Sequence, residues 1–364
     1  MGKKILLLGN SHLAIFGFRG EIIDRLVKEG NEVIISFPNG PFGDGEATSK
    51  KYGCKFVETP LNRRGKNPVQ DIYLIAKYCS IIQKYKPDTI LAFTVKCDIY
   101  GGIASRLLGV PFLPNITGLG KGLSEDGLTK FLTTFLYKIA IKKARCVFFQ
   151  NESDKCFFES NHIRFSKFVI LPGSGVNLSK FSVLPYPTSS SKVIFTYIAR
   201  VMKAKGIDQF LEAAKVIKEK YSNTEFHICG YCEEDYTAII QEAQNQNIVI
   251  YHGLVNDVEP YERMSSCIVL PSFHPEGISN VLLEAAACGR PIITTDRTGC
   301  RETVIHGVTG YLIKEKSSED LIEKMEKFLD LSVEERQEMG LKGRKKMEAE
   351  FDRQIVVDKY LENL

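Results

Sequence analysis

The chain has 364 residues, of which 44% are hydrophobic and 25% are charged, and its formal net charge is +4. This length exceeds what one compact core accommodates and suits two domains of roughly 150–200 residues each. The positive charge is not gathered into the Lys/Arg runs that mark nucleic-acid-binding arms, so we expect no nucleic-acid partner. An anionic ligand and an anionic membrane surface both remain compatible with the composition.

Ten cysteines lie within or beside apolar segments, as is typical of reduced thiols in a cytoplasmic protein. Cys229 and Cys232 have the CxxC spacing of redox and metal motifs, but a single such pair is more simply a coincidence of spacing. The apolar run of residues 5–8 is too short for a signal peptide. No segment approaches the roughly 18 apolar residues of a membrane span, so we expect a cytoplasmic protein.

Strand-like and helix-like segments alternate along both halves of the chain. Residues 3–37 contain an apolar strand, a Gly/Asn/Ser loop, an amphipathic helix and a second strand, and residues 192–230 repeat this order. Further apolar strand-like segments follow in each half: residues 88–93, 110–116, 146–151 and 168–174 in the first, and residues 247–253, 267–273 and 291–296 in the second. The alternation predicts parallel sheets covered by helices on both faces.

We therefore expect an α/β protein with two doubly wound, Rossmann-like domains facing across a cleft. The N-terminal domain is expected over residues 1–182, a Pro/Ser-rich linker over 183–192, and the C-terminal domain over 193–345. Residues 346–364 are expected to form a C-terminal helix that either caps the second domain or crosses back to the first.

Doubly wound sheets bind ligands beyond the carboxyl ends of their strands. Gly9, Gly17 and Gly20 follow the first strand, but they do not form G-x-G-x-x-G, and the second strand ends without an acidic residue for a ribose. Both departures argue against a dinucleotide oxidoreductase. In the second half, Arg200 and Lys205 lie in the loop where a phosphate would meet the amides of the next helix. The alternative is that they are two solvated cations.

Residues 274–291 place Glu276 in a loop after a buried strand and Glu284 in an apolar, helical run. Because an ionised carboxylate is expensive to bury, Glu284 needs a partner. Ser279 or Asn280 suits the N-cap of this helix, and eight helical residues rise by roughly 12 Å, about the span from sugar to ribose in a nucleotide sugar. A carboxylate can bind both ribose hydroxyls, and the amides between the two acids suit a phosphate.

Residues 276–284, EGISNVLLE, resemble the E-x7-E motif of the retaining GT-B glycosyltransferases of family GT4. The resemblance extends over nearly the whole chain through FRGEIIDRLVKEGNEV, NITGLGKGLS, FFQNESDKCFF, GSGVNLSKF, ARVMKAKGID and TGCRETVIHGVTGYL. Within the family, it is to bacterial capsule and lipid-linked oligosaccharide enzymes of the polyprenyl-diphospho-bacillosamine N-acetylgalactosaminyltransferase type.

The resemblance implies transfer of a hexose or N-acetylhexosamine, with retention, from a UDP-sugar to a polyprenyl-diphosphate-linked saccharide in cell-surface glycan assembly. It implies that Arg200 and Lys205 neutralise the leaving diphosphate while Glu276 contacts the donor sugar. The remaining donor-binding candidates are Glu284, Gly277, Ile278, Ser279, Asn280, Asn10 and Ser11. Residues 10–16 of the acceptor-binding N-terminal domain would close over the phosphates. No metal or other cofactor is expected, and no D-x-D motif follows a predicted strand.

The acceptor-side signals are less specific. Many relatives carry a His in the loop that here reads NITGLGKG, and Asn115 or Thr117 stands near that place. A basic loop with Arg63, Arg64 and Lys66 suits an acceptor diphosphate or is simply solvated.

Residues 127–146 are helical by pattern, with Phe131, Phe135, Leu136 and Ile139 interleaved with lysines. This helix either packs on its own sheet or contacts an anionic membrane surface beside a lipid-linked acceptor. In the second case the protein would be peripheral on the inner face of the cell membrane.

Two other classes share these features. A GT-B epimerase or hydrolase of nucleotide sugars would have the same fold and donor site, and a non-catalytic protein would bind a nucleotide sugar without turnover. Glu302, Gly307 and Gly310 match a family segment behind the donor site, and a purely structural role is the equal alternative for them.

Overall fold

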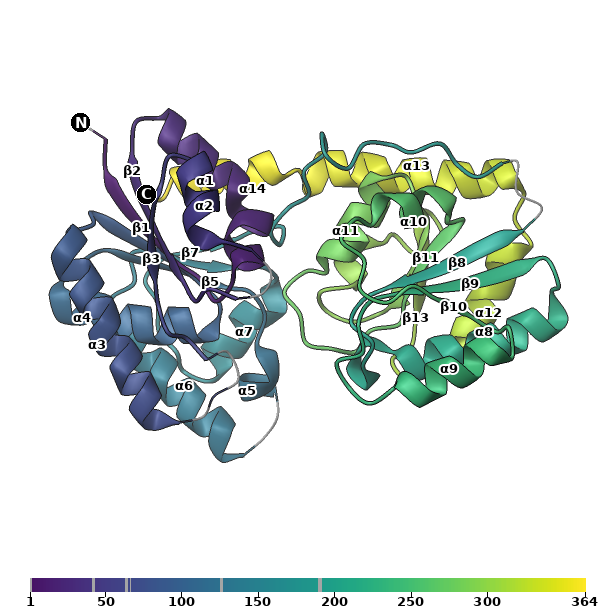
Figure 1. Cartoon of the computed structure of the whole chain (residues 1–364), viewed down its shortest axis with the longest axis horizontal. Coiled ribbons are helices and arrows are strands. Elements are labelled where there is room, and N and C mark those ends of the chain that lie inside the picture. Colours follow the sequence, from purple (N-terminus) through teal and green to yellow (C-terminus); the bar gives the residue numbers. More distant parts are fainter. Residues whose placement is uncertain (1, 41–42, 63–64, 66, 125–126, 189–191) are drawn as a thin grey trace. The chain divides into compact units, whose positions relative to one another are not determined.

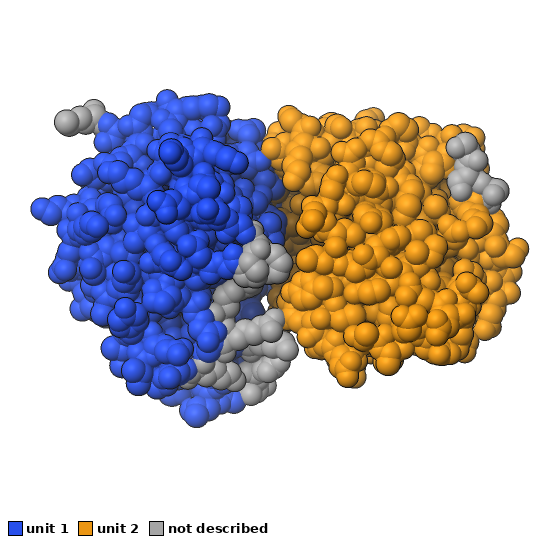
Figure 2. Space-filling model, viewed as in Figure 1, with its two compact units in different colours: residues 1–174, 353–364 blue, residues 175–352 orange. Residues whose placement is uncertain are grey.

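The computed structural model describes residues 2–40, 43–62, 65, 67–124, 127–188 and 192–364. The chain divides into two compact units, shown in separate colours in Figure 2. Unit 1 comprises Met1–Ser174 and Arg353–Leu364, and unit 2 comprises Gly175–Asp352. Each unit is a parallel sheet with helices on both faces, which confirms the predicted pair of doubly wound, Rossmann-like folds.

The sheet of unit 1 has seven strands in the order β3-β2-β1-β4-β5-β6-β7, and all adjacent pairs are parallel. The strands are β1 (Lys4–Leu8), β2 (Glu32–Phe37), β3 (Lys55–Glu58), β4 (Thr89–Phe93), β5 (Phe112–Ile116), β6 (Val147–Phe149) and β7 (Phe168–Ile170). The chain reverses its direction of sheet growth between β1 and β4, and ligands of this fold bind beyond the strand ends at such a switch point.

The helical elements of unit 1 connect these strands and cover both faces of the sheet (Figure 1). They are η1 (Leu13–Gly17), α1 (Phe18–Lys28), α2 (Gly45–Lys51), α3 (Pro68–Tyr85), η2 (Cys97–Gly101), α4 (Gly102–Leu108), α5 (Gly120–Ser124), α6 (Leu128–Ala140), α7 (Glu152–Ser160) and α14 (Arg353–Leu361). The start of α3 shows how the sequence sets such a boundary. Asn67 caps the helix by accepting a hydrogen bond from the Val69 amide at 2.9 Å, and Pro68 follows at the first helical position.

Alternate residues of each central strand enter different cores, because successive side chains point to opposite faces of a sheet. Leu6 and Leu8 of β1 join the core beneath α3, α4 and α6, whereas Ile5 and Leu7 join the core that contains Tyr360 of α14. Both faces of this sheet are therefore buried, as expected from the continuous apolar runs in the sequence.

The sheet of unit 2 has six parallel strands in the order β10-β9-β8-β11-β12-β13. Its strands are β8 (Val193–Ile198), β9 (Thr224–Cys229), β10 (Ile250–Tyr251), β11 (Cys267–Leu270), β12 (Ile292–Thr295) and β13 (Gly310–Ile313). The helical elements are η3 (Lys203–Lys205), α8 (Ile207–Lys220), α9 (Thr237–Asn245), α10 (Glu259–Met264), α11 (Asn280–Ala287), η4 (Arg301–Thr303), α12 (Ser318–Leu329) and α13 (Val333–Glu350). The switch point of this sheet lies between β8 and β11.

The first segment of unit 1 ends at Ser174, whereas the sequence predicted the domain boundary at residue 182. Val176 and Phe181 are buried in the core of unit 2, so the segment after Ser174 already belongs to that unit. The start of the expected linker is likewise held by unit 2, because Arg290 donates hydrogen bonds to the carbonyls of Leu184 and Pro185 at 3.2 and 2.6 Å.

The C-terminal segment differs from the single helix expected over residues 346–364. Helix α13 runs to Glu350, and α14 begins separately at Arg353 and belongs to unit 1. The Val176 amide donates to the Phe351 carbonyl at 2.8 Å, so the two chain crossings between the units run side by side. No helix among the described residues is both long enough and apolar enough to cross a bilayer.

Candidate active site

The first group of candidate residues follows β8, at the switch point of unit 2. Lys205 ends the short 3-10 helix η3, and only 8% of its side chain is exposed. Gly206 then adopts a left-handed conformation with φ of +78°, and a Cβ there would lie 2.1 Å from the carbonyl oxygen of Pro271. The chain can therefore turn closely against the exit of β11 only because this position is glycine.

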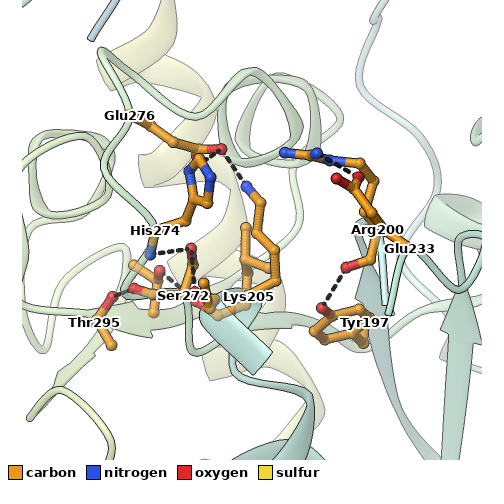
Figure 3. Close-up of polar contacts among 11 residues, drawn as sticks. Tyr197, Arg200, Lys205, Glu233, Ser272, His274, Glu276 and Thr295 are labelled. Carbon is orange, nitrogen blue, oxygen red and sulfur yellow. Dashed lines mark hydrogen bonds and ion pairs between the residues drawn. The ribbon is translucent and has the colours of Figure 1, made fainter. Parts of the chain in front are cut away.

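Glu276 approaches Lys205 from the loop after β11. The Lys205 ammonium donates to Oε1 of Glu276, and the Nδ1 atom of His274 lies 3.9 Å from the same oxygen (Figure 3). Glu276 retains 21% exposure of its side chain. Strands β8 and β11 are adjacent in the sheet, so the switch point brings together a cation and an acid that are 71 residues apart in the sequence.

The loop that carries Glu276 is fixed by hydrogen bonds to neighbouring elements. The Phe273 amide donates to the Ala204 carbonyl at 2.9 Å, which ties the loop to η3. The Thr295 hydroxyl, at the end of β12, donates to the carbonyl of Ser272, and the Ser272 hydroxyl accepts from the His274 amide at 3.3 Å (Figure 3). The carboxylate is thus held by elements at the ends of three neighbouring strands.

Opposing effects set the charge of Glu276. Burial acts to raise the pKa of its carboxyl, but the charges of Lys205, His274 and Arg200 and the hydrogen bond from Lys205 outweigh burial and leave the pKa lowered. Glu276 is therefore ionised at neutral pH. An ionised acid in this setting can accept hydrogen bonds from sugar hydroxyls.

Arg200 lies at the start of the same loop, and its guanidinium is directed toward the space beside Lys205 and Glu276 (Figure 3). Its Nη1 atom forms an ion pair with Glu233, which lies in the loop after β9. The buried Tyr197 hydroxyl donates to the Arg200 carbonyl at 3.0 Å and so fixes the backbone of the loop.

The segment between the two motif acids corrects one expectation from the sequence. Ser279 occupies the N-cap position of α11, but its side chain makes no capping hydrogen bond. Its amide donates to the Gly299 carbonyl at 2.7 Å, so this amide is already engaged and does not face a phosphate. Gly277 and Ile278 are buried, and Asn280 is half-buried at the first position of the helix.

Glu284 lies in α11 and is half-buried rather than enclosed, so burial alone does not require a ligand there. The helix begins only at Asn280, which means that residues 276–279 contribute no helical rise. The separation of roughly 12 Å expected from eight helical residues therefore does not apply between Glu276 and Glu284.

Glu302 stabilises the turn behind this segment. Its Oε2 atom accepts from the Gly299 amide at 2.8 Å, and burial raises the pKa of the carboxyl. Gly299 has φ of +92°, and a Cβ there would lie 2.8 Å from the Glu276 carbonyl oxygen. Gly310 approaches the backbone of Ile292 in a similar way. These contacts give Glu302 and Gly310 structural roles.

In unit 1, the segment after β1 is more ordered than the loop expected there. Residues Leu13–Gly17 form a π-helix, and Ile15 is buried in the core. Asn10 and Ser11 remain partly exposed; the Ser11 hydroxyl accepts from the Ala14 amide at 3.2 Å and lies 3.3 Å from Oδ1 of Asn10.

The two acceptor-side candidates on β5 and the loop after it differ in access. Asn115 is buried, and its amide group donates to the hydroxyl of Tyr360 in α14, so a structural role accounts for it. Thr117 directly follows β5 and is partly exposed, which leaves it as the accessible candidate of the pair. Arg63, Arg64 and Lys66 lie outside the described residues.

Helix α6 presents apolar side chains to solvent. It ends at Ala140 rather than near residue 146, so Lys142 and Lys143 follow the helix instead of lying in it. Its buried positions are Thr134, Tyr137 and Ala140. The outward-facing apolar residues, between 51% and 81% exposed, are Leu128, Phe131, Leu132 and Phe135. Packing on the sheet therefore accounts for one face of α6 and not for this one.

Two residues of the unit 2 site were not selected from the sequence. His274 precedes Glu276 by two positions. Its closeness to the motif acid is the sequence feature that indicates a place in the site. Glu233 follows Cys232 in the segment CGYCEED, where the cysteine spacing is the motif that the sequence offers. All ten cysteines are described, and none forms a disulfide. Cys229 is buried, and the Cys232 sulfur lies 3.6 Å from the Tyr251 hydroxyl.

Comparison with known proteins identifies both halves of the chain. Residues 185–346 match the family model "Glycosyl transferases group 1", and residues 4–151 match "Glycosyl transferase 4-like". The chain is 27% identical to the N,N'-diacetylbacillosaminyl-diphospho-undecaprenol alpha-1,3-N-acetylgalactosaminyltransferase of Campylobacter jejuni, over 98% of this chain and 97% of that protein. It is also 27% identical to the capsular polysaccharide biosynthesis glycosyltransferase CapM of Staphylococcus aureus, over 84% of each chain.

Among solved structures, Anabaena HepE in complex with UDP and glucose superposes with a TM-score of 0.79 at 17% identity, over 99% of this chain and 98% of that one. This likeness concerns the fold, which is GT-B. Taken with the two family models, it defines the class: the chain is a GT4-like glycosyltransferase, with a group 1 domain in unit 2 and a 4-like domain in unit 1.

Proposed function

We propose that this glycosyltransferase moves a hexose or N-acetylhexosamine from a UDP-sugar to a saccharide carried on a polyprenyl diphosphate, with retention of configuration. The observation that carries the proposal is the convergence of Arg200, Lys205 and Glu276 at the switch point of unit 2 (Figure 3). The printed name of the Campylobacter relative, which acts on a diphospho-undecaprenol, supports the class of acceptor.

The chemistry follows from the charges of these groups. When a sugar leaves a nucleoside diphosphate, positive charge develops on the sugar and negative charge on the departing phosphate oxygen. Arg200 and Lys205 stabilise that oxygen as its charge grows, and Glu276 accepts hydrogen bonds from the sugar hydroxyls. The cations therefore supply what a divalent metal supplies in other transferases, and we propose a metal-independent reaction.

Glu284 is proposed to hold the ribose of the donor. It lies on α11 one turn after Asn280, and a carboxylate in that position can accept hydrogen bonds from both ribose hydroxyls. Thr117, after β5 of unit 1, is proposed to contact the acceptor or the transferred sugar.

A donor screen that measures nucleotide release tests this function. Each UDP-sugar is incubated with the enzyme with and without a short polyprenyl-diphosphate saccharide, in excess EDTA. Acceptor-dependent UDP release with a lengthened saccharide is expected. Release without acceptor would instead indicate hydrolysis, an epimerised donor would indicate an epimerase, and binding without turnover would indicate a nucleotide-sugar-binding protein. Activity that is lost in EDTA and restored by Mg²⁺ or Mn²⁺ would contradict the metal-independent reaction.

We further propose that α6 attaches the enzyme to the membrane that holds the acceptor. Its outward apolar face contains Phe131 and Phe135, and the exposed Lys138, Lys142 and Lys143 lie at and just beyond the end of the helix. Aromatic side chains enter the boundary between headgroups and acyl chains, while each lysine near an anionic leaflet adds about 1 kcal/mol of attraction. An anionic membrane surface complements both features.

Liposome sedimentation tests this attachment. Binding to anionic vesicles is expected to weaken as salt rises, because salt screens the lysines. The triple variant Lys138→Glu, Lys142→Glu, Lys143→Glu and the double variant Phe131→Ser, Phe135→Ser should each lose binding while both keep activity on a water-soluble acceptor analogue. If both variants still sediment with anionic vesicles at low salt, the membrane contact lies elsewhere.

A further inference from the structure

The ion pair between Arg200 and Glu233 brings a second carboxylate to the proposed diphosphate site. Glu233 is 13% exposed and Arg200 is 36% exposed, so the pair lies at the surface of the site rather than in the core. Lys205 is paired in the same way with Glu276. Each of the two candidate phosphate-binding cations is thus paired with a different acid (Figure 3).

The position of Glu233 is fixed by the backbone around it. Its amide donates to the Val201 carbonyl at 3.0 Å, and the Val201 amide donates to the Tyr231 carbonyl at 2.9 Å. At the start of this loop, Gly230 passes so close to Ala199 that a Cβ would lie 1.7 Å from the Ala199 carbonyl oxygen. The loop after β9 is therefore clamped along the loop after β8, and the carboxylate stays beside Arg200.

We propose that Glu233 is an exchangeable counter-ion of Arg200, which it releases to the donor diphosphate and recaptures when UDP leaves. A guanidinium prefers bidentate contact with oxyanions, and a carboxylate and a phosphate offer it similar oxygen pairs. Because both anions use the same guanidinium, Glu233 lowers the affinity for UDP and favours product release. This inference rests on the proposed role of Arg200 in binding the donor diphosphate.

A structural role for Glu233 predicts the opposite result. If the acid only held Arg200 in the correct position, its removal would leave the guanidinium misplaced, and UDP would bind more weakly. If the acid competes with the diphosphate, its removal frees the cation, and UDP binds more tightly. The sign of the change in UDP affinity therefore separates the two roles.

Calorimetry with UDP alone provides the test, using Glu233→Gln and a matched control, Glu234→Gln. Glu234 belongs to the same loop and carries the same charge, but its carboxylate accepts from the Lys203 amide at 2.8 Å. Glu233→Gln is expected to lower the Kd for UDP about twofold to fivefold, within the range of one partly exposed ion pair. Glu234→Gln should leave the Kd nearly unchanged.

The same change is then made in an Arg200→Ala background. Arg200→Ala alone should weaken UDP binding, and adding Glu233→Gln should have no further effect, because the counter-ion acts only through the arginine. An unchanged or higher Kd for Glu233→Gln, an equal gain from Glu234→Gln, or a gain that persists without Arg200 would each overturn the exchange. Arg200→Ala with unaltered UDP affinity would instead remove the proposed donor role of Arg200 itself. Glu233→Ala, with thermal unfolding as the check on folding, repeats the test with a second side chain.

Discussion

The switch points of the two sheets place charged residues at corresponding positions but in different surroundings. In unit 2, Lys205 follows the first strand and Glu276 follows the fourth, and 21% of the Glu276 side chain is exposed. In unit 1, Arg19 follows the first strand and Asp98 follows the fourth, and both are buried. Both cations are buried, so the two pairs differ in their acids: Glu276 is partly exposed, whereas Asp98 is fully enclosed.

Tyr360 of the C-terminal helix α14 lies beside the buried pair of Arg19 and Asp98 in unit 1. Tyr360 of α14 packs edge-to-face on Phe148, with ring centroids 4.7 Å apart, and accepts a hydrogen bond from Asn115. Burial raises the pKa of Asp98 well above its usual range, although the Arg19 charge acts in the opposite direction. In unit 2 the charges around Glu276 outweigh burial and lower the pKa of that acid.

A polar pair at a switch point is therefore not by itself a functional site. Access decides whether the charges are available to a ligand. An acid whose pKa is lowered stays ionised and can bind a substrate, whereas burial that raises the pKa of an acid disfavours its charged form. We therefore expect substitutions in unit 2 to change turnover and substitutions in the unit 1 cluster to change stability.

The largest expected effect is that of Lys205→Ala on turnover. Removal of the fixed cation at the leaving oxygen should lower kcat by on the order of 10²-fold or more, because that charge stabilises the transition state. The matched control is Lys203→Ala, since Lys203 lies in the same 3-10 turn and is exposed. Steady-state kinetics measures kcat for both variants. Equal kcat values would contradict the expectation that the charged residues of the unit 2 site act in turnover.

Substitutions of the two motif acids should change different quantities, the UDP affinity for Glu284 and kcat for Glu276, each by about tenfold. Glu284→Gln should mainly weaken UDP binding, because a ribose contact is similar in the ground and transition states. Glu276→Gln should mainly lower kcat, because its contacts to the sugar strengthen as charge develops. Calorimetry with UDP is the measurement, and an equal loss of UDP affinity in both variants would contradict the assignment of Glu276 to the sugar.

The smallest expected effect on turnover is at Asp98, where we expect a pH-dependent change in stability instead. Because the folded pKa of Asp98 lies above the unfolded value, the folded state binds this proton more tightly. That stabilisation is complete below the unfolded pKa of about 3.9 and is lost as pH rises through the folded pKa. The natural chain should therefore lose Tm relative to Asp98→Asn as pH rises.

Thermal unfolding at several pH values measures this difference, with the exposed Asp235→Asn as control. Turnover at neutral pH should be nearly the same in the Asp98→Asn variant and the natural chain. A Tm difference that does not depend on pH would show that Asp98 is ionised in both the folded and the unfolded chain, and would remove the contrast with Glu276.

The sequence by itself determined the class of fold and the motif that leads to the site. Apolar runs alternating with amphipathic helices predict parallel sheets, because this pattern is local and each run is buried on both faces. The spacing of Glu276 and Glu284 and the positions of Arg200 and Lys205 after a predicted strand are equally local. These features need no knowledge of what packs against them.

The tertiary structure decided which residues meet and which remain accessible. The unit boundary at Ser174 depends on the packing of Val176 in unit 2, and an apolar residue near a boundary has the same pattern whichever core receives it. Asn115 is enclosed by Tyr360, which lies 245 residues later in the sequence. Such contacts depend on how distant segments are brought together, and no local period or spacing encodes them.

The tertiary structure also determined which charged residues form ion pairs. The sequence contained Glu233 and Glu276 as two acids among many, and the order of strands β9, β8 and β11 brought one to Arg200 and the other to Lys205. The Ser279 amide, expected to face a phosphate, is engaged by the Gly299 carbonyl because the turn before Glu302 passes behind it. Hydrogen-bond partners and access to solvent are properties of the folded arrangement, and only the tertiary structure determines them.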